Sequence, residues 1–294
     1  MNYLLFHVGK IPDHFFVCIN NILSVDSKAN IFLVTDSNLE IKGLNILNIE
    51  EHDELMMKKN KILTIFKDTI LETNPLWYAS FLRVFGLSYA SSHFKINKFV
   101  HFDNDVLIYK PFSKIMESGV IKKNLINITQ IDETNLVFGY SYFDNLDNLK
   151  YLEDFFEKVL QNNSYYRNNF HKGRPIHEMR VLKLAAESNP TIFSILPSLP
   201  YQNETIFDPA SYGQYLNGTH VKRGNFIFKK RWISTNHIVG RELKSKRIKV
   251  VFKNQQPSVF FQNKSYELVN LHVHSKNLNK FVSSNYREHF KKQP

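Results

Sequence analysis

The stretch KFVHFDNDVLIYKPF, residues 98–112, holds two aspartates one residue apart between two apolar runs. The run before them, residues 99–102, predicts a buried strand, and the apolar residues 106–108 predict a return into the core. Residues i and i+2 of an extended chain project to the same side, so Asp103 and Asp105 can present two carboxylates to one point. Such a pair suits a hard divalent cation such as Mg²⁺ or Mn²⁺. The alternative is a solvated turn in which Asp-Asn-Asp supplies only turn chemistry.

The chain before this stretch has the pattern of an α/β sheet. Apolar runs predict strands at residues 3–8, 30–35 and 43–49, and helical spacing predicts helices at residues 15–23 and 76–90. Strand, helix and strand at this spacing favour parallel strands. The two aspartates would then lie at the carboxyl end of a strand, where open α/β sheets bind ligands. Because protein-bound Mg²⁺ is usually shared with substrate phosphates, a nucleotide or nucleotide-sugar ligand is the first hypothesis.

Composition indicates a globular chain with a large core. The 294 residues are 43% hydrophobic and 14% aromatic. No run of 18 or more apolar residues occurs, and the apolar N-terminus is too short for a signal peptide, so we expect a cytoplasmic protein. The single cysteine, Cys18, excludes an intrachain disulfide and a multi-cysteine zinc site, and we expect it to be a packed core residue.

The formal net charge of +11 favours an anionic partner. Basic residues cluster at residues 229–231, 241–249 and 291–292. Nucleic acid, phosphorylated substrates and an anionic membrane surface all fit this charge, as does an ordinary solvated surface. Charge alone does not choose among them.

Beyond residue 112 the pattern is less regular. Residues 146–160 and 176–186 have helical spacing, whereas residues 189–218 are rich in Pro, Asn and Tyr and predict a long loop that shapes a binding cleft. The run ELVNLHVH, residues 267–274, predicts a strand with His272 and His274 on one face. Histidine can complete a carboxylate metal site, and Lys276 could neutralise a phosphate, although a hydrogen-bonded pair of surface histidines would give the same pattern.

Four segments occur in an informative order: YASFLRVFGLSYA (residues 78–90), HFDNDV (101–106), HEMRVLK (177–183) and NLHVHSK (270–276). Together they resemble the GT-A glycosyltransferases, in particular the glycogenin-like retaining families and related bacterial polysaccharide enzymes. The segments look like the arginine-bearing helix, the Asp-x-Asp motif, the acidic helix of the acceptor half and the terminal His and Lys segment. The last segment departs from the glycogenin-like spacing, in which His and Lys lie farther apart and a Gly intervenes.

The resemblance implies a GT-A fold, a Rossmann-like mixed sheet with flanking helices in a single continuous domain. Residues 1–112 would form the nucleotide-sugar-binding half, and residues 113–294 the acceptor half with the C-terminal metal-ligand segment. The metal would be Mn²⁺ or Mg²⁺, held by Asp103 and Asp105 with His272 or His274. Arg83 would brace the donor site and Lys276 would contact the diphosphate. The implied donor-binding residues are His7, Val8, Asp36, Arg83, Asp103, Asn104 and Lys276.

The implied activity is transfer of a hexose from a nucleoside diphosphate, preferably uridine diphosphate, to a hydroxyl of a glycan or lipid-linked acceptor. Such transfer would serve polysaccharide biosynthesis, with retention expected and a peripheral contact with the inner face of an anionic membrane. An inverting enzyme would need a carboxylate base, for which Glu178 and Asp208 are the candidates. Glu178 could instead pair or cap on its helix, and Asp208 before Pro209 could begin a turn. The side chains of Tyr212, Gln214 and Tyr215 could contact sugars.

Two other functions stay open. A metal-dependent nuclease or nucleotidyltransferase would also use paired aspartates and a basic surface. A non-catalytic nucleic-acid-binding protein would use the positive charge and the aromatic residues, although most of those are spaced as core. We favour the glycosyltransferase, and therefore expect no nucleic-acid partner.

Overall fold

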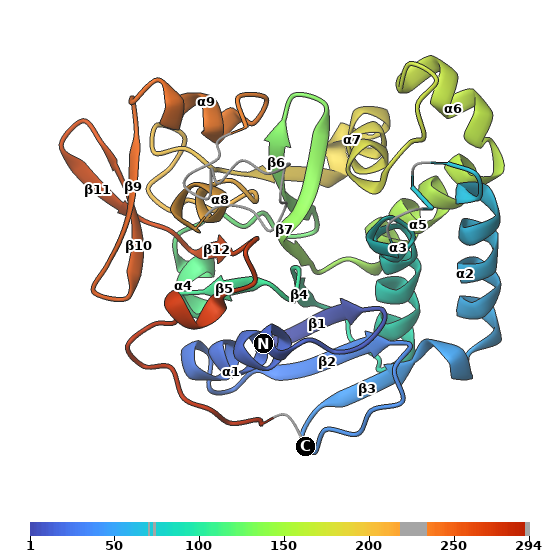
Figure 1. The fold of residues 1–294 in the computed structure, drawn as a ribbon, viewed down its shortest axis with the longest axis horizontal. Helices are drawn as coiled ribbons and strands as arrows, with labels where there is room; N and C mark the ends of the chain where they lie inside the picture. Colours follow the sequence, from blue (N-terminus) through green and yellow to red (C-terminus); the bar gives the residue numbers. More distant parts are fainter. Residues whose placement is uncertain (70, 73–74, 218–233, 292–294) are drawn as a thin grey trace, which may run out of the picture.

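The computed structural model describes residues 1–69, 71–72, 75–217 and 234–291, and in this part of the chain a mixed sheet of seven strands forms the centre (Figure 1). The strand order is β3-β2-β1-β4-β7-β6-β8. Strand β7 runs antiparallel to both of its neighbours, and the other pairs are parallel. The strands are β1 (Asn2–His7), β2 (Asn30–Thr35), β3 (Asn45–Asn48), β4 (Phe99–His101), β6 (Ile126–Asp132), β7 (Asn135–Phe143) and β8 (Phe193–Leu196). The predicted mixed sheet is confirmed.

Helices cover both faces of this sheet. Alternation along β1 shows the two faces, because Tyr3 and Leu5 belong to the core layer under α1 whereas Leu4 belongs to the layer under α2, α3, α5 and α7. The α-helices are α1 (Asp13–Val25), α2 (Asp53–Phe66), α3 (Pro75–His93), α4 (Phe112–Glu117), α5 (Leu146–Gln161), α6 (Asn163–Phe170), α7 (Glu178–Ser188), α8 (Tyr212–Asn217) and α9 (Ile238–Lys244). Short 3-10 helices occupy Ile49–Glu51, Pro190–Ile192 and Leu278–Lys280.

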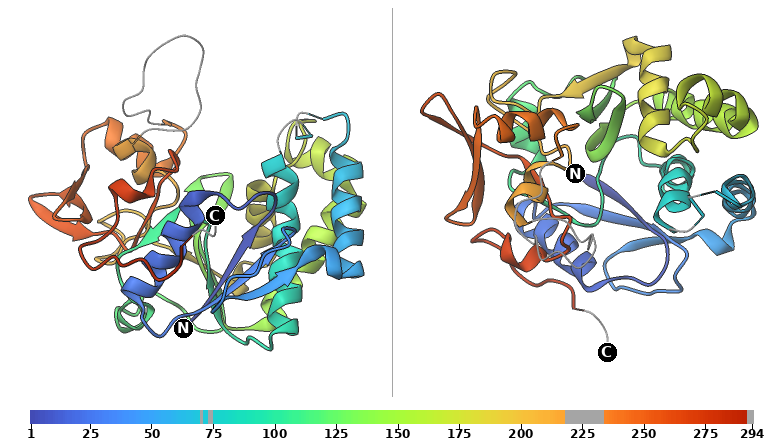
Figure 2. Two further views of the ribbon diagram at one scale, coloured as in Figure 1. Left: turned by 60° about the horizontal axis from the view of Figure 1, so that its bottom comes forward. Right: turned by 45° about the horizontal axis from the view of Figure 1, so that its top comes forward.

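Two smaller sheets bring the C-terminal part of the chain to the main sheet. Strand β5 (Val106–Ile108) pairs antiparallel with β12 (Asn270–His272). The other edge of β5 is held by Asn21 of α1, whose side chain bonds both the N–H and the carbonyl of Ile108. Strands β9 (Lys249–Lys253), β10 (Gln256–Phe261) and β11 (Lys264–Glu267) form an antiparallel sheet, which lies on the opposite side of the molecule from α2 and α6 (Figures 1 and 2).

Several predicted elements are confirmed. Strand β2 has the predicted bounds, β1 and β3 and the helices at residues 15–23, 76–90, 146–160 and 176–186 differ only at their ends, and Cys18 is buried. The predicted loop at residues 189–218 is wrong, since it contains β8 and α8. Strand β8 escapes recognition because it is a short edge strand, paired only with β6 and partly exposed at Ile195. The strand predicted at 267–274 is also too long, because Glu267 is the last residue of β11 and only Asn270–His272 form β12.

The basic clusters are only partly described. Residues 229–231 and Lys292 lie outside the described residues, whereas residues 241–249 cover the end of α9 and the start of β9. None of the helices in the described part of the chain has both the length and the apolar character needed to cross a bilayer.

Candidate active site

The Asp-Asn-Asp run forms the turn between β4 and β5, in which the Val106 N–H donates to the Asp103 carbonyl at 3.1 Å. This turn lies at the carboxyl end of β4, as the sequence predicted. The Asp105 side chain is 1% exposed and that of Asp103 is 30% exposed. Because the register of β5 and β12 sets His272 opposite Val106, the sheet pairing itself brings the histidine segment to the aspartates.

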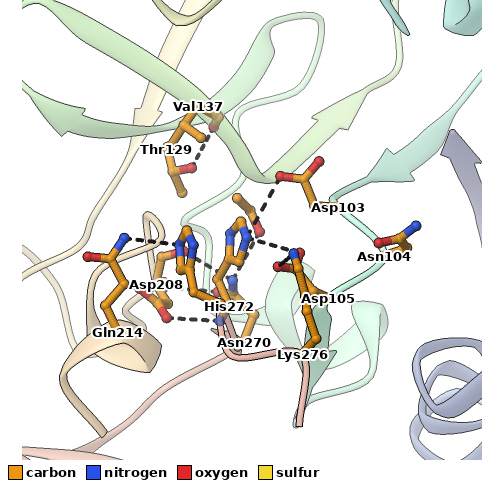
Figure 3. Close-up of polar contacts among 12 residues, drawn as sticks. Asp103, Asn104, Asp105, Thr129, Val137, Asp208, Gln214, Asn270, His272 and Lys276 are labelled. Carbon is orange, nitrogen blue, oxygen red and sulfur yellow. Dashed lines mark hydrogen bonds and ion pairs between the residues drawn. The ribbon is translucent and has the colours of Figure 1, made fainter. Parts of the chain in front are cut away.

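His272 faces both carboxylates (Figure 3). Its Nε2 lies 3.0 Å from Asp105 Oδ1 and 3.9 Å from Asp103 Oδ2. The His274 ring stacks on that of His272, with centroids 4.4 Å apart and planes 7° from parallel. One donor atom from each of Asp105, His272 and His274 lies within 4.8 Å of the others, so these three residues form a candidate metal site. The carboxylate oxygen suits Mn²⁺, and imidazole nitrogen is a ligand of divalent transition metals.

The protonation of these groups follows from their mutual contacts. Burial acts to raise the pKa of Asp105, but His272 and Lys276 hold it well below its usual value. Burial acts to lower the pKa of His272, and the Asp105 carboxylate raises it above its usual value. Burial, together with the neighbouring His272, lowers the pKa of His274 to about 3. His274 is therefore the neutral imidazole of the pair, which is the form that binds metals.

Lys276 occupies the second oxygen of Asp105. Its Nζ pairs with Oδ2, while His272 uses Oδ1 (Figure 3). The Lys276 backbone has φ 62°, in the left-handed region, and its N–H donates to the Val273 carbonyl at 2.9 Å, which closes a turn after β12. The side chain is 40% exposed. A solvent-accessible ammonium therefore neutralises an almost completely buried carboxylate.

Arg83 and Glu178 form a buried pair on the other side of the aspartates. Arg83 of α3 donates from Nε to Glu178 Oε1 at 2.9 Å and from Nη2 to Oε2 at 2.8 Å, and its Nη1 pairs with Asp103 Oδ1. The side chains of Arg83 and Glu178 are 8% and 4% exposed. Burial raises the pKa of Glu178 to about 7 against the opposing effect of the guanidinium. Burial also acts to raise the pKa of Asp103, but Arg83 holds it below its usual value.

Asp208 binds backbone rather than facing a cavity. Its Oδ1 accepts from the N–H groups of Ser211 and Tyr212 at 2.6 and 2.9 Å. Its Oδ2 accepts from those of Gly213 and His272 at 3.0 and 2.9 Å. The carboxylate therefore satisfies the first N–H groups of α8 and attaches that helix to β12. The fit is tight, because a Cβ at Gly213 would lie 1.9 Å from the His272 carbonyl oxygen.

Asn270 and Gln214 make hydrogen bonds that position the segment carrying His272 and His274. The Asn270 side chain donates to the carbonyls of Gly139 and Asp208 at 3.1 and 3.2 Å and accepts from the Asp208 N–H at 3.0 Å. This contact joins β12 to β7. The Gln214 amide nitrogen lies 3.1 Å from His274 Nε2. Neither role for these two residues was predicted, since the partners are distant in the sequence.

Asn104 connects the metal turn to the end of β1. Its Nδ2 donates to His7 Nδ1 at 2.7 Å, so His7 carries its proton on Nε2, which donates to the Lys10 carbonyl at 3.1 Å. Its Oδ1 accepts from His14 Nε2 at 3.3 Å. Burial lowers the pKa of both histidines, and the Lys276 ammonium lowers both further. The structure thus brings His7 and Asn104 together and adds His14, which the sequence analysis did not single out.

Asp36 lies at the end of the neighbouring strand β2. Its Oδ1 accepts from the Gly9 N–H at 2.7 Å, and its Oδ2 lies 3.3 Å from Nζ of Lys59. Val8 follows β1 and packs against the core layer under α2 and α3. Asp36 and Val8 therefore border the carboxyl ends of β1 and β2, with no contact to Asp103 or Asp105 among the interactions of the described residues.

The two carboxylates predicted as candidate bases both have their oxygens occupied by other groups of the chain. Glu178 has both oxygens bound by Arg83, and Asp208 is completely buried with both oxygens bound by backbone N–H groups. Both carboxylates hold other parts of the site in position. Tyr212 is likewise buried, with its hydroxyl bonded to the Ser198 carbonyl, so it is not a sugar contact.

No protein-family model matches the sequence, and no curated protein does. One similar solved structure is mouse xyloside xylosyltransferase 1, at 11% identity and a TM-score of 0.43, covering 67% of this chain and 86% of that one. A second is an active-site mutant of LgtC, at 12% identity and a TM-score of 0.45, covering 79% and 82%. A third is the PaToxG glycosyltransferase, at 14% identity and a TM-score of 0.42, covering 64% and 69%. These are enzymes of the class that the sequence resembles, but such low values do not carry their activity over to this chain.

Proposed function

We propose that this protein is a metal-dependent glycosyltransferase that moves a sugar from a nucleoside diphosphate to an acceptor hydroxyl. The observation that carries the proposal is the meeting of two carboxylates, an imidazole and two cations at the carboxyl end of β4. Carboxylates and imidazole suit a divalent cation, and an exposed lysine beside them suits the phosphates of a donor. A nucleotide-dependent transferase needs both functions at one point.

Each residue of the site has a role in this proposal. Asp103 and Asp105 would hold Mn²⁺ or Mg²⁺ together with His272 or His274, of which His274 is the neutral imidazole. When bound, the metal would supply positive charge that stabilises the leaving diphosphate. Lys276 would add a second positive charge there. The two aspartates have fixed positions, because Arg83 holds Asp103 and the β5–β12 pairing holds Asp105 against His272.

Retention of configuration is the stereochemical outcome that we propose. Inversion by direct displacement needs a carboxylate base beside the acceptor. The two carboxylates considered for that role, Glu178 and Asp208, are buried and bound to Arg83 and to backbone N–H groups. This supports the retaining chemistry that the family resemblance implies.

The donor would bind along the carboxyl ends of β1, β2 and β4. We propose a uridine diphosphate hexose, with residues 1–112 supplying most donor contacts and residues 113–294 the acceptor side. His7, Asn104 and Asp36 lie at these strand ends and are the candidate contacts for the nucleoside. Open α/β sheets bind ligands at this edge, which supports the assignment.

The acceptor would be a glycan or a lipid-linked sugar of a polysaccharide pathway. The basic residues 241–249 support contact with an anionic membrane leaflet, since each exposed basic residue there contributes about 1 kcal/mol. Two members of the cluster already have acidic partners, as Arg241 pairs with Glu133 and Arg247 with Glu242.

Thermal unfolding tests the proposal directly. Wild-type protein, Asp105→Asn and the control Asp154→Asn, which removes an exposed carboxylate of α5, would be heated with Mn²⁺ and each nucleoside diphosphate in turn. We expect Mn²⁺ with uridine diphosphate to raise the melting temperature of the wild type and of the control but not of Asp105→Asn. Stabilisation by single-stranded nucleic acid, with none by any nucleotide, would favour a nucleic-acid-binding protein instead.

A further inference from the structure

We propose that Lys276 is an exchangeable counter-cation, which pairs with Asp105 before the metal binds and moves to the donor diphosphate when the metal takes its place. The inference rests on the proposed function and specifies how metal and donor binding depend on each other. Lys276 would thus pair first with the Asp105 carboxylate and then with the donor diphosphate, both of which are anions.

Asp105 needs a positive neighbour at every stage. Its side chain is 1% exposed, and an unpaired carboxylate at such a depth would be strongly unfavourable. One of its oxygens contacts His272 and the other contacts Lys276, so both are occupied by groups of this chain. A divalent cation at Asp105 would meet the ammonium at the same carboxylate, and like charges at that separation repel. Metal binding therefore requires Lys276 to leave.

Lys276 is able to leave, whereas Arg83 is not. The Lys276 side chain is 40% exposed and has Asp105 as its ion-pair partner among the described residues. Arg83 is 8% exposed and holds Asp103 while two of its nitrogens are bound to Glu178. A lysine has a flexible four-carbon stem and a compact charge, in contrast to the planar guanidinium fixed by paired bonds. The backbone at residue 276 stays in place through its bond to the Val273 carbonyl.

The donor side of the site is within the influence of this ammonium. Lys276 acts electrostatically on His7 and His14, which together hold Asn104 at the end of β1. Asp105 and these residues lie at the carboxyl edge of the sheet, where open α/β sheets place a ligand. A released ammonium therefore remains close to where the diphosphate would bind, and its charge favours that anion.

This exchange predicts opposite effects of one substitution on two ligands. Lys276→Met keeps the length of the stem and removes the charge. In metal-free protein without nucleotide, it should tighten Mn²⁺ binding by roughly tenfold, because the competing cation is gone; couplings of this kind are typically about 5- to 150-fold. With Mn²⁺ saturating, it should weaken uridine diphosphate binding by a similar factor, because the diphosphate loses its lysine.

Titration calorimetry with MnCl₂ alone, and then with uridine diphosphate at saturating Mn²⁺, measures both affinities. Lys276→Gln serves as a second neutral variant. Lys280→Met, at an exposed lysine of the nearby 3-10 helix, is the matched control for loss of one positive charge, and it should change neither affinity appreciably.

The outcomes separate the two proposals. Tighter Mn²⁺ with weaker nucleotide in both neutral variants, and not in the control, supports the exchange. Unchanged or weaker Mn²⁺ binding in the variants overturns the exchange and leaves the proposed function intact, since Lys276 would then only order Asp105. If the wild type binds neither Mn²⁺ nor uridine diphosphate, the proposed function and the exchange are both overturned.

Discussion

The two aspartates of the candidate site are each paired with a cation, one of them buried and the other exposed to solvent. On the helix side, Arg83 of α3 and Glu178 of α7 form a buried pair that reaches Asp103. On the strand side, Lys276 reaches Asp105 from a turn that is open to solvent. The difference indicates that the Arg83 pair belongs to the scaffold of the fold, whereas the Lys276 contact can be broken without disturbing the fold. Stability and ligand binding should therefore respond to different sides of the site.

The largest effect should come from breaking the helix side. Arg83→Met leaves Glu178 and Asp103 without their common cation in a buried place, which should reduce the free energy of unfolding by about 3–5 kcal/mol. Urea denaturation measures this loss. The double variant Arg83→Met with Glu178→Met should recover part of it, because an apolar pair leaves no uncompensated Glu178 charge. A loss below about 1 kcal/mol would mean that the pair is not part of the scaffold.

A smaller loss in the free energy of unfolding should follow from changing Asp208, whose carboxylate binds the backbone of α8 and β12. In Asp208→Asn, an amide nitrogen replaces one of the two oxygens that accept four backbone N–H bonds. Hydrogen bonds to charged groups contribute about 1.5–3 kcal/mol, so we expect a loss of about 2 kcal/mol in urea denaturation. Mn²⁺ affinity should fall as well, because His272 loses its backbone anchor. A normal affinity would show that the β5–β12 pairing alone positions His272.

Lys276→Met should reduce the free energy of unfolding less than Arg83→Met does, because His272 still faces the Asp105 carboxylate. Solvent already screens the 40% exposed ammonium, so its removal costs less than removal of the buried guanidinium, although Asp105 is left with one positive neighbour instead of two. Measuring the loss in free energy of unfolding for Lys276→Met and Arg83→Met in the same urea series therefore tests whether the two cations differ in their contribution to the fold. Equal losses in the two variants would remove the distinction between a scaffold cation and an exchangeable one.

The smallest expected effect is a pH dependence on the strand side. Asp105 raises the pKa of His272 against the effect of burial, so protonated His272 stabilises the metal-free fold. This contribution is fully present below the unfolded value of 6.5 and is lost as pH rises through the folded pKa. Urea denaturation of chelator-treated protein at about pH 6 and about pH 9 should show a steeper loss for wild type than for His272→Asn. Equal slopes would mean that His272 does not titrate in this range.

Local pattern predicted the first half of the fold well. Strands β1 and β2 and helix α1 have continuous apolar runs or clear helical spacing, and buried parallel strands are read from such runs. The edge strand β8 and the six-residue helix α8 carry little periodicity of their own. Helix α8 depends on the Asp208 carboxylate for its first N–H groups, and an aspartate ahead of a short helix looks the same as one that begins a turn.

The components of the site were predicted better than their roles. The spacing of Asp103 with Asp105, and of His272 with His274, was enough to place each pair on one side of its segment. What each carboxylate contacts depends on partners far away in the chain, such as Arg83 and Glu178, which are 95 residues apart. Sequence reasoning therefore left two interpretations open for Glu178 and for Asp208, a candidate base or a structural carboxylate, and the fold shows their charges holding an arginine and a helix end.

Gly213 limits how this sequence can diverge. Since any side chain at this position would collide with the His272 carbonyl, a saturation library selected for folding should retain only glycine there. The aspartate that accepts the Gly213 N–H lies five residues earlier in the chain. Selection on the packing of α8 against β12 would thus preserve an Asp-x₄-Gly signature, by which remote homologues of this chain could be recognised even where their surfaces have changed completely.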